Sequence, residues 1–254
     1  MQLGAVTYNV LKDFEVEPLI KILETTGFQA VELRAEHKHN VSPALTPPQR
    51  EALKARFQAS KVRLLSYGTT CEFQSPDDAV RAKNVEEAKR WIELAHDTGA
   101  WAIKVRPNGY PPNVTMAVTH ARISECLREI AQYGAGRGVE IWMEVHGRGT
   151  QDPPNSAAIL RGAKHENVGA CWNSNPTDIV NGSIKPSFQL LGPLIKNVHI
   201  NELANPAYPW RELFDLLKQA KYERYTLCEA QESKEPERFL LWYAALWREQ
   251  TRSC

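Results

Sequence analysis

The chain has 254 residues, of which 43% are hydrophobic and 24% are charged, so it is long enough and apolar enough to bury a large core. Its 31 Lys and Arg residues against 30 Asp and Glu residues give a formal net charge of +1, which argues against the strongly basic surface that nucleic acid or an anionic membrane would require. No run of about 18 consecutive apolar residues is present, so we expect no membrane-spanning segment.

The N-terminal residues 1–6 contain no basic region followed by an apolar stretch, so we expect no signal peptide and a cytoplasmic location. The chain has 5 cysteines, an odd number, and no two of them have the CxxC spacing. Cys171 and Cys228 stand inside apolar, strand-like runs, where cysteine behaves as a small hydrophobic residue. We therefore expect reduced thiols rather than structural disulfides.

Short apolar runs rich in Val and Ile recur along the whole chain. Such runs are typical of strands that are buried on both faces, as in a parallel sheet covered by helices. The predicted strands cover residues 3–8, 30–33, 62–67, 101–105, 139–145, 168–172, 195–200 and 225–228.

Helical patterns separate these strands. Apolar stripes with helical spacing run through residues 85–95, 123–131 and 213–220. The weakest helix is the sixth, after residue 172, because Pro176, Gly182 and Pro186 interrupt its pattern. Eight strands, each followed by a helix, predict an α/β fold that is a (β/α)8 TIM barrel, with residues 1–254 forming a single domain. A doubly wound open sheet is the alternative, but no GxGxxG motif follows the first strand.

Polar side chains stand where the last four predicted strands end. In a barrel of this kind the active site lies at the carboxyl ends of the strands. The intervals from Glu144 to Asn173, from Asn173 to His199 and from His199 to Glu229 are 29, 26 and 30 residues. Each interval is close to one β/α repeat, so neighbouring strands would direct these four side chains at a common point.

With these four residues the chain resembles the xylose-isomerase-like superfamily, over nearly its whole length. That superfamily includes sugar epimerases, hydroxypyruvate isomerase, inosose dehydratase and the endonuclease IV branch. In its epimerase-like members a Glu, an Asp, a His and a second Glu bind one Mn, Mg, Co or Zn ion, and the two Glu residues form an acid/base pair. The resemblance implies that Glu144, Asn173, His199 and Glu229 bind one divalent metal ion and that Glu144 and Glu229 are catalytic.

Two positions depart from the family pattern. Asn173 stands where the family normally has Asp, and Pro176 stands where it often has a substrate-binding His. An Asn carbonyl oxygen can still bind a hard cation, but the site then has one negative charge less. We expect a metal ion that is bound less tightly and that remains a stronger Lewis acid.

Each assignment has a plainer alternative. Glu144 and Glu229 lie in apolar runs, where a carboxylate needs a partner, so either could form a structural ion pair with Lys104 or Arg106. His199, taken alone, could be a hydrogen-bonded core histidine; its register with the two Glu residues favours a ligand.

Five further residues are candidates for binding substrate, because each lies at or just after a predicted strand end. Lys104 and Arg106 share strand parity, and His146 shares parity with Glu144. The candidates are His37, Lys104, Arg106, His146 and Asn175.

The sequence thus predicts a metal-dependent isomerase or epimerase of a sugar or related polyol, working by proton abstraction beside a carbonyl through an enediolate. A dehydratase or lyase would use the same first step. A non-catalytic sugar-binding barrel is the alternative from another class, and the near-neutral charge argues against an endonuclease-IV-like nuclease. The expected partner is a small carbohydrate-like substrate, with neither nucleic acid nor membrane, and a homo-oligomer stays open.

Overall fold

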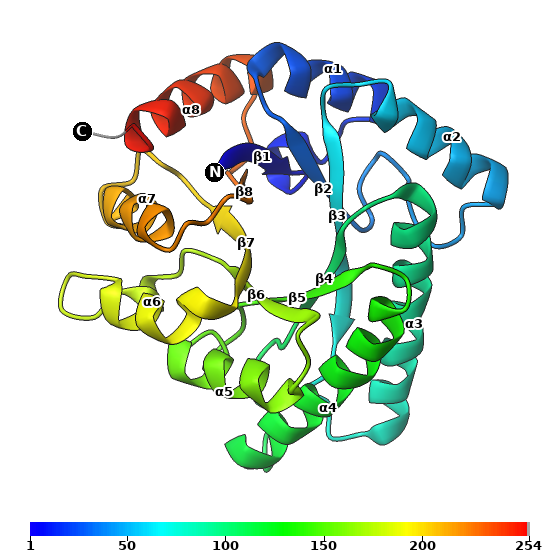
Figure 1. The fold of residues 1–254 in the computed structure, drawn as a ribbon, viewed down its shortest axis with the longest axis vertical. Helices are drawn as coiled ribbons and strands as arrows, with labels where there is room; N and C mark the ends of the chain where they lie inside the picture. The colour runs from blue at the N-terminus through cyan, green and yellow to red at the C-terminus, as the bar shows by residue number, and fades with distance from the viewer. Residues whose placement is uncertain (253–254) are drawn as a thin grey trace.

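Eight parallel strands close into a barrel in the computed structural model, which describes residues 1–252 (Figure 1). The strands follow one another in chain order around the barrel, and β8 (Tyr225–Cys228) pairs with β1 (Gln2–Val6) to complete it. Helices surround the barrel on its outside. The predicted (β/α)8 fold is confirmed, and the open sheet is excluded.

The other strands are β2 (Ala30–Arg34), β3 (Arg63–Glu72), β4 (Ala102–Arg106), β5 (Glu140–Glu144), β6 (Val168–Trp172) and β7 (Ile195–Ile200). The α-helices are α1 (Val16–Thr26), α2 (Pro47–Gln58), α3 (Asp78–Thr98), α4 (Met116–Ala135), α5 (Pro153–Ala163), α6 (Lys185–Leu191), α7 (Trp210–Gln219) and α8 (Pro236–Gln250). Three 3-10 turns complete the description: η1 (Asn9–Leu11), η2 (Pro176–Asp178) and η3 (Gly192–Leu194).

Side-chain and glycine caps set several helix ends. The Asp77 carboxylate accepts hydrogen bonds from the first-turn amides of α3, and so satisfies donors that have no partner within the helix. Helices α1 and α3 end at Gly27 and Gly99, whose φ values of 83° and 78° lie in the left-handed region that glycine adopts without strain.

Two elements differ from a plain β/α repeat. Strand β3 continues to Glu72, five residues beyond the predicted end at residue 67, because its polar end pairs with Arg106 of β4. The weakly predicted sixth helix is split into η2, a short α6 and η3, as the prolines and glycine in that segment indicated.

Apolar side chains fill the part of the barrel interior that lies farther from the carboxyl ends of the strands. Trp142 lies among them, whereas Trp172 faces outward and packs against Phe188 of α6, with ring centroids 5.9 Å apart. Trp142 stands two residues before Glu144 and so faces the same side of its strand, whereas Trp172 is next to Asn173 and so faces the opposite side. The interior cluster consists of Val6, Ala30, Leu65, Ala102, Trp142, Cys171, Tyr225 and Leu227.

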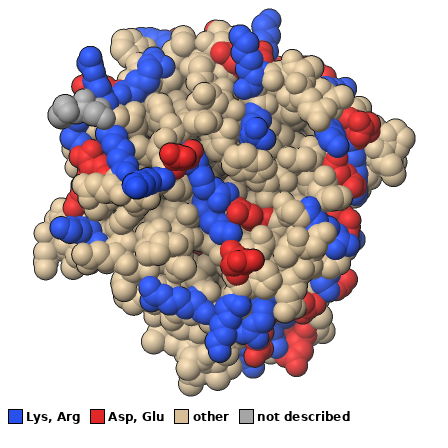
Figure 2. All heavy atoms as spheres, in the orientation of Figure 1, with Lys and Arg blue, Asp and Glu red and all other residues tan. Residues whose placement is uncertain are grey.

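Four of the five cysteines, at positions 71, 126, 171 and 228, are buried free thiols. The fifth, Cys254, lies outside the described residues. Within residues 1–252 every helix is too short or too polar to cross a lipid bilayer. On the face seen in Figure 2, Lys and Arg residues are interspersed with Asp and Glu residues.

Candidate metal centre

A layer of polar side chains lies directly above the apolar cluster, nearer the carboxyl ends of the strands. Side chains alternate along a strand, so a residue two positions beyond an interior residue also faces the interior. Completely buried His199 joins this layer from β7. The successive interior pairs are Ala30 and Glu32, Ala102 and Lys104, Trp142 and Glu144, Cys171 and Asn173, and Leu227 and Glu229.

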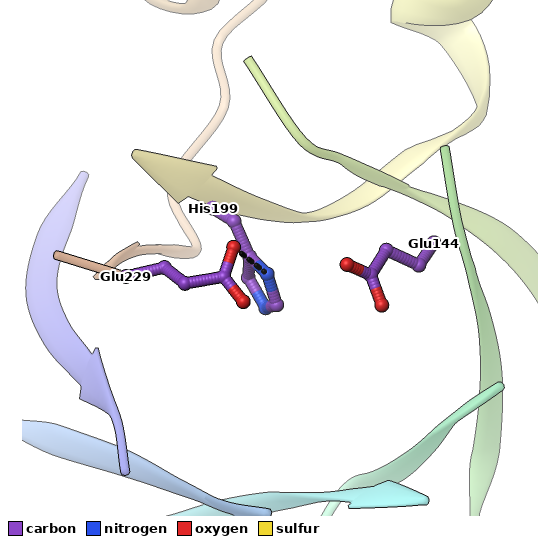
Figure 3. Close-up of side chains that lie close together, drawn as sticks. All are labelled: Glu144, His199 and Glu229. Atoms are coloured by element: carbon purple, nitrogen blue, oxygen red, sulfur yellow. Dashed lines mark ion pairs between the residues drawn. The ribbon is translucent and has the colours of Figure 1, made fainter. Parts of the chain in front are cut away.

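Three of these residues form a group that could hold a metal ion. Glu144, His199 and Glu229 each offer one ligand atom, and these atoms all lie within 4.8 Å of one another. The carboxylates of Glu144 and Glu229 point toward each other from β5 and β8, with the imidazole of His199 beside Glu229 (Figure 3). The Nδ1 atom of His199 lies 3.3 Å from Oε2 of Glu229. The predicted convergence of these three side chains is therefore present in the structure.

Several buried polar atoms around this point have no hydrogen-bond partner among the described residues. Both ring nitrogens of His199 and the Oδ1 atom of Asn173 are in this state. A buried polar atom without a partner costs free energy, and most such atoms in proteins are satisfied. Nitrogen and oxygen atoms left free beside two carboxylates are the donor set that a divalent cation requires, so the residues present fit a metal ion.

Glu32 is the member of the layer that the sequence analysis missed. Its side chain is completely buried, accepts a 2.9 Å hydrogen bond from the Ser66 hydroxyl, and has Oε1 lying 3.5 Å from Nε2 of His199. A signal was available, since Glu32 interrupts an apolar strand-like run just as Glu144 does.

Lys104 occupies the space between two of the carboxylates. Its ammonium group is buried, donates to Glu144 and lies 3.8 Å from Oε1 of Glu32. The ion pair that the sequence offered as an alternative for Glu144 is therefore present. Glu144 also belongs to the possible ligand group, so the ion pair and the metal site share this carboxylate.

The formal charges of the layer do not cancel. Glu32, Glu144 and Glu229 contribute three negative charges and Lys104 one positive charge, which leaves two negative charges when His199 is neutral, the form in which an imidazole binds a metal ion. An uncompensated buried charge is costly. One divalent cation would neutralise this set.

The electrostatics of the layer shift the pKa values of its members. Burial alone would raise the pKa of Glu144, but the Lys104 ammonium and His199 hold it at about 2. Burial would lower the pKa of His199, yet the surrounding acidic groups, Cys171 and Glu229 foremost, raise it well above its ordinary value. The carboxylates of this layer thus favour any cation placed among them.

A second polar cluster lies at the rim, on the β3–β5 side. Arg106 donates to Glu72 across 3.0 Å, and the Asn108 amide donates to the same carboxylate oxygen. His146 Nδ1 is 3.0 Å from Oδ1 of Asn108. Arg106 and His146 are therefore linked through two intermediate residues, and both remain partly exposed.

The other two predicted substrate residues also make structural contacts. The Nδ1 atom of His37 forms a 3.0 Å hydrogen bond with the Thr7 hydroxyl, directly beyond β1. The Asn175 amide donates to the carbonyl oxygen of Val145 across 2.6 Å and so ties the loop after β6 to the end of β5. Among residues 1–252, His37 retains a free ring nitrogen, whereas the amide group of Asn175 is occupied by this backbone contact.

Comparisons with known proteins agree with this architecture. A family model described as "Xylose isomerase-like TIM barrel" matches residues 20–250. No curated protein matches the sequence. Among solved structures, the chain is similar to D-psicose 3-epimerase from Clostridium cellulolyticum H10, with a TM-score of 0.84 and 16% identity over 100% of both chains.

Two further solved structures carry information on chemistry. The IOLI protein with a binding zinc atom gives a TM-score of 0.79 at 16% identity, covering 99% of this chain and 96% of its own. The probable 3-DHS dehydratase AsbF from Bacillus anthracis gives a TM-score of 0.74 at 14% identity over 100% of both chains. At these identities the likeness establishes the shared fold.

Proposed function

Because the chain belongs to the xylose isomerase-like TIM barrel family, we propose that this protein is a divalent-metal-dependent isomerase or epimerase of a sugar or related polyol. The observation that carries the proposal is the pair of carboxylates, Glu144 and Glu229, that face each other beside a buried histidine whose ring nitrogens have no hydrogen-bond partner within residues 1–252. Similarity to a D-psicose 3-epimerase supports the substrate class.

In this proposal the metal ligands are Glu144, Asn173, His199 and Glu229, and the ion is Mn, Mg, Co or Zn. The net charge of the layer and its unpaired nitrogen and oxygen atoms support a divalent ion, and the zinc atom in the similar IOLI protein supports binding at a barrel of this kind. When bound, the ion supplies Lewis-acid polarisation of a substrate carbonyl.

The two glutamates carry the proton transfers. One glutamate, as the carboxylate, removes the proton from the carbon beside the substrate carbonyl, and the other, as the carboxylic acid after taking up a proton from solvent, gives a proton to the neighbouring carbon or to the opposite face. An enediolate links the two steps. Lys104 keeps Glu144 ionised, as a proton acceptor must be, while Glu229, whose side chain is 14% exposed, lies nearer to solvent.

Rim residues orient the substrate above these carboxylates. His37 and His146 each have a second ring nitrogen to offer to a hydroxyl group, and Arg106 offers guanidinium donors beyond its contact with Glu72. Lys104 and Asn175 stay candidates for substrate contact, although each would first have to leave its present partner.

The first test replaces each carboxylate by the amide of the same shape. Glu144→Gln and Glu229→Gln are expected to lower kcat at least about 100-fold, the usual scale for losing a positioned acid or base. Glu202→Gln is the matched control, because Glu202 lies at the same end of the barrel, its carboxylate accepts a hydrogen bond from the Gln231 backbone amide, and it is not a member of the ligand group.

The assay follows ketoses such as D-psicose and D-tagatose in D2O with Mn added, and reads both product formation and deuterium incorporation beside the carbonyl by NMR. Near-parental exchange in either glutamine variant would contradict the acid/base assignment. An absence of any exchange in the parent, across keto sugars and metal ions, would favour the non-catalytic sugar-binding barrel.

A dehydratase is the second candidate, supported by similarity to the probable 3-DHS dehydratase AsbF. It would share proton abstraction and then expel a β-hydroxyl group instead of returning the proton. The appearance of a conjugated carbonyl in the ultraviolet spectrum, without an isomeric sugar, would favour this outcome. A nuclease with several metal ions gains no support, because residues 1–252 contain one group of potential metal ligands.

A further inference from the structure

The outer face of α8 carries the most exposed large apolar side chain among the described residues. Trp242 is 68% exposed, and its neighbour Leu241 is 46% exposed. Other exposed apolar residues lie elsewhere: Met116 and Val118 are on α4, and Val180 lies in the loop between η2 and α6. Helix α8 lies on the outside of the barrel between α1 and α7, so this face is turned away from the barrel (Figure 1).

The opposite face of α8 already accounts for the packing of the helix. Leu240, Tyr243 and Ala244 are buried, and the Tyr243 hydroxyl donates to the carbonyl oxygens of Ile200 and Asn201 at the end of β7. Trp242 therefore contributes little to holding α8 on the barrel. Large apolar groups exposed in a contiguous patch usually mark an interaction surface.

Six exposed positions on α8 and at its two ends have the spacing of a helix-pairing seam. They run from Glu235, the residue before the helix, to Arg252, the second residue after it, and are separated by 3, 4, 3, 4 and 3 residues, which is the a/d pattern of a coiled coil. Apolar residues occupy the middle of the seam and charged residues occupy its ends. In order, the seam consists of Glu235, Arg238, Trp242, Ala245, Glu249 and Arg252.

The seam is complementary to itself when reversed. Suppose that helix α8 of a second copy lies antiparallel to the first, with the two-fold axis passing between positions 243 and 244. Each seam residue of one copy then faces the seam residue of the other copy that lies equally far from this axis in the opposite direction along the sequence. Each a position then faces a d position, as in antiparallel coiled coils, and every charged pair has opposite signs. The pairs are Glu235 with Arg252, Arg238 with Glu249, and Trp242 with Ala245, each occurring twice around a two-fold axis.

We propose that two copies of this chain associate through α8, with the Trp242 side chain of each lying over Ala245 of the other and with reciprocal Arg238–Glu249 ion pairs at both ends. The small Ala245 leaves room for the indole ring, and flanking apolar side chains, Leu241 and partly buried Leu246, extend the contact. The four charged positions select a second copy in this antiparallel register over an uncharged apolar partner or a lipid surface.

Within residues 1–252 of one chain, the same charged residues form ion pairs with each other three positions apart. The Nη1 atom of Arg238 lies 3.0 Å from Oε2 of Glu235, and Nη1 of Arg252 lies 3.9 Å from Oε2 of Glu249; all four side chains are exposed. Such exposed pairs contribute little stability, so they can exchange partners on association at small cost.

The test uses two single charge reversals in the full chain. In an Arg238→Glu dimer, the new carboxylate of each copy would face Glu249 of the other copy, so that like charges meet at both ends of the seam. In Glu249→Arg, both ends would bring the new guanidinium against Arg238 of the other copy. Each variant alone is expected to be monomeric. An equimolar mixture is expected to form a 1:1 heterodimer, because opposite charges can then meet along the seam.

Sedimentation velocity measures the mass of the parent, the variants and the mixture at about 50 mM and about 500 mM NaCl. The protein concentration is about 100 µM, which is above the micromolar Kd expected of a small interface. The parent and the mixture should sediment as dimers and Trp242→Glu as a monomer. Val118→Glu, at an exposed apolar position on α4, is the matched control and should leave the dimer intact. Circular dichroism and thermal unfolding verify that each variant is folded.

A parent that is monomeric at this concentration would overturn the proposal. A dimer that survives Trp242→Glu, or variants that dimerise alone and gain nothing on mixing, would also overturn it, since the interface would then lie elsewhere or have another register. Binding of the parent to neutral lipid vesicles, lost in Trp242→Glu without any dimer, would identify a membrane as the occupant and likewise contradict it.

Discussion

Asn173 is the residue at which this chain departs most sharply from the metal-binding pattern it otherwise follows. Its Oδ1 atom is buried and has no hydrogen-bond partner in the described part of the chain, which is the state expected of an oxygen that awaits a cation. An amide oxygen binds a hard cation less strongly than a carboxylate does, so Asn173 as a ligand would lower the affinity for the ion and leave it with a higher effective charge.

Asn173→Asp is expected to bind Mn and Mg at least about 10-fold more tightly, because it adds a negative charge at the ion. Turnover should fall or stay level, because the ion polarises a carbonyl less. Calorimetric titration together with the D2O exchange assay measures both effects. Asn205→Asp, exposed at the same end of the barrel, controls for the general change in charge.

Three outcomes of that titration have different meanings. Unchanged affinity would exclude Asn173 from the ligand set. Activity that appears only in the Asp variant would mean that the parent site has lost its function. Tighter binding with increased turnover would contradict the Lewis-acid argument.

Lys104 is expected to compete with the metal ion for Glu144, since its ammonium group contacts this carboxylate. Lys104→Met should therefore raise divalent affinity and lower the stability of the metal-free protein by about 3 kcal/mol, the scale for breaking a buried ion pair. Thermal unfolding with and without Mn measures both effects. Lys196→Met, which removes a partly exposed pair with Glu140, is the control. Weaker metal binding in Lys104→Met would show that Lys104 supports the site instead of competing for it.

At the scale of elements, the segment after β6 is held by a buried carboxyl group. Asp178, at the end of η2, accepts hydrogen bonds of 2.8 Å from the Tyr208 hydroxyl and from the backbone amide of Asn175. Tyr208 precedes α7 and in turn accepts from the Trp172 indole. This contact joins the loops after β6 and β7 close to two of the proposed metal ligands.

Burial raises the pKa of Asp178 to about 7 from an ordinary value of 3.8. The folded state therefore binds a proton more tightly than the unfolded state does. Between about pH 4 and pH 7 the folded state holds more protons, so this group contributes stability at low pH that is lost as the pH rises. Above about pH 7 the buried carboxylate is ionised, and its contribution no longer changes.

Asp178→Asn is expected to remove this dependence, because an amide stays neutral while its oxygen can accept the same two hydrogen bonds. The variant's unfolding free energy, relative to the parent, should rise by on the order of 3 kcal/mol between about pH 4.5 and about pH 8. Urea unfolding at the two pH values measures the difference. Asp215→Asn, on the exposed side of α7, is the control. Parallel curves for parent and Asp178→Asn would mean that Asp178 is not preferentially protonated in the fold.

At the scale of the whole molecule, the candidate metal centre joins strands that are far apart in the chain. Its proposed ligands come from the ends of β5, β6, β7 and β8, and β8 closes the barrel against β1. A ligand that binds only the folded state stabilises it in proportion to the logarithm of its concentration over Kd.

Removal of the metal with EDTA is therefore expected to lower Tm. At a metal concentration of about 100 times Kd the stabilisation is about 2.7 kcal/mol, or roughly 5–10 °C for a protein of this size. His199→Ala should keep its secondary structure, lose most of its bound metal after dialysis, and show little Tm response to Mn. Unchanged metal content in His199→Ala, measured by atomic emission, would identify His199 as a core histidine.

Local patterns along the chain were sufficient to predict the eight strands and the convergence of Glu144, His199 and Glu229. Both follow from rules that act over a few residues: strands buried on both faces read as short Val- and Ile-rich runs, and a side chain at a strand end faces the same end of the barrel as its neighbours. The split sixth helix could also be predicted, because proline and glycine interrupt a helix wherever they occur.

The ion-pair partner of each buried charged side chain could not be predicted in the same way. Lys104 stands 72 residues after Glu32 and 40 residues before Glu144, and the three meet only because the barrel closes around them. Arg106, only two residues from Lys104, pairs instead with Glu72, because β3 extends far enough to bring that carboxylate to the rim.

For the seam of α8, too, the sequence determines one part and the packed structure another. Its heptad spacing is present in the sequence, but only the packed structure shows that this seam faces outward while Leu240 and Tyr243 face the barrel. Periodicity restricts a side chain to one face of its own element, whereas the neighbour that this face meets is decided by how the elements pack.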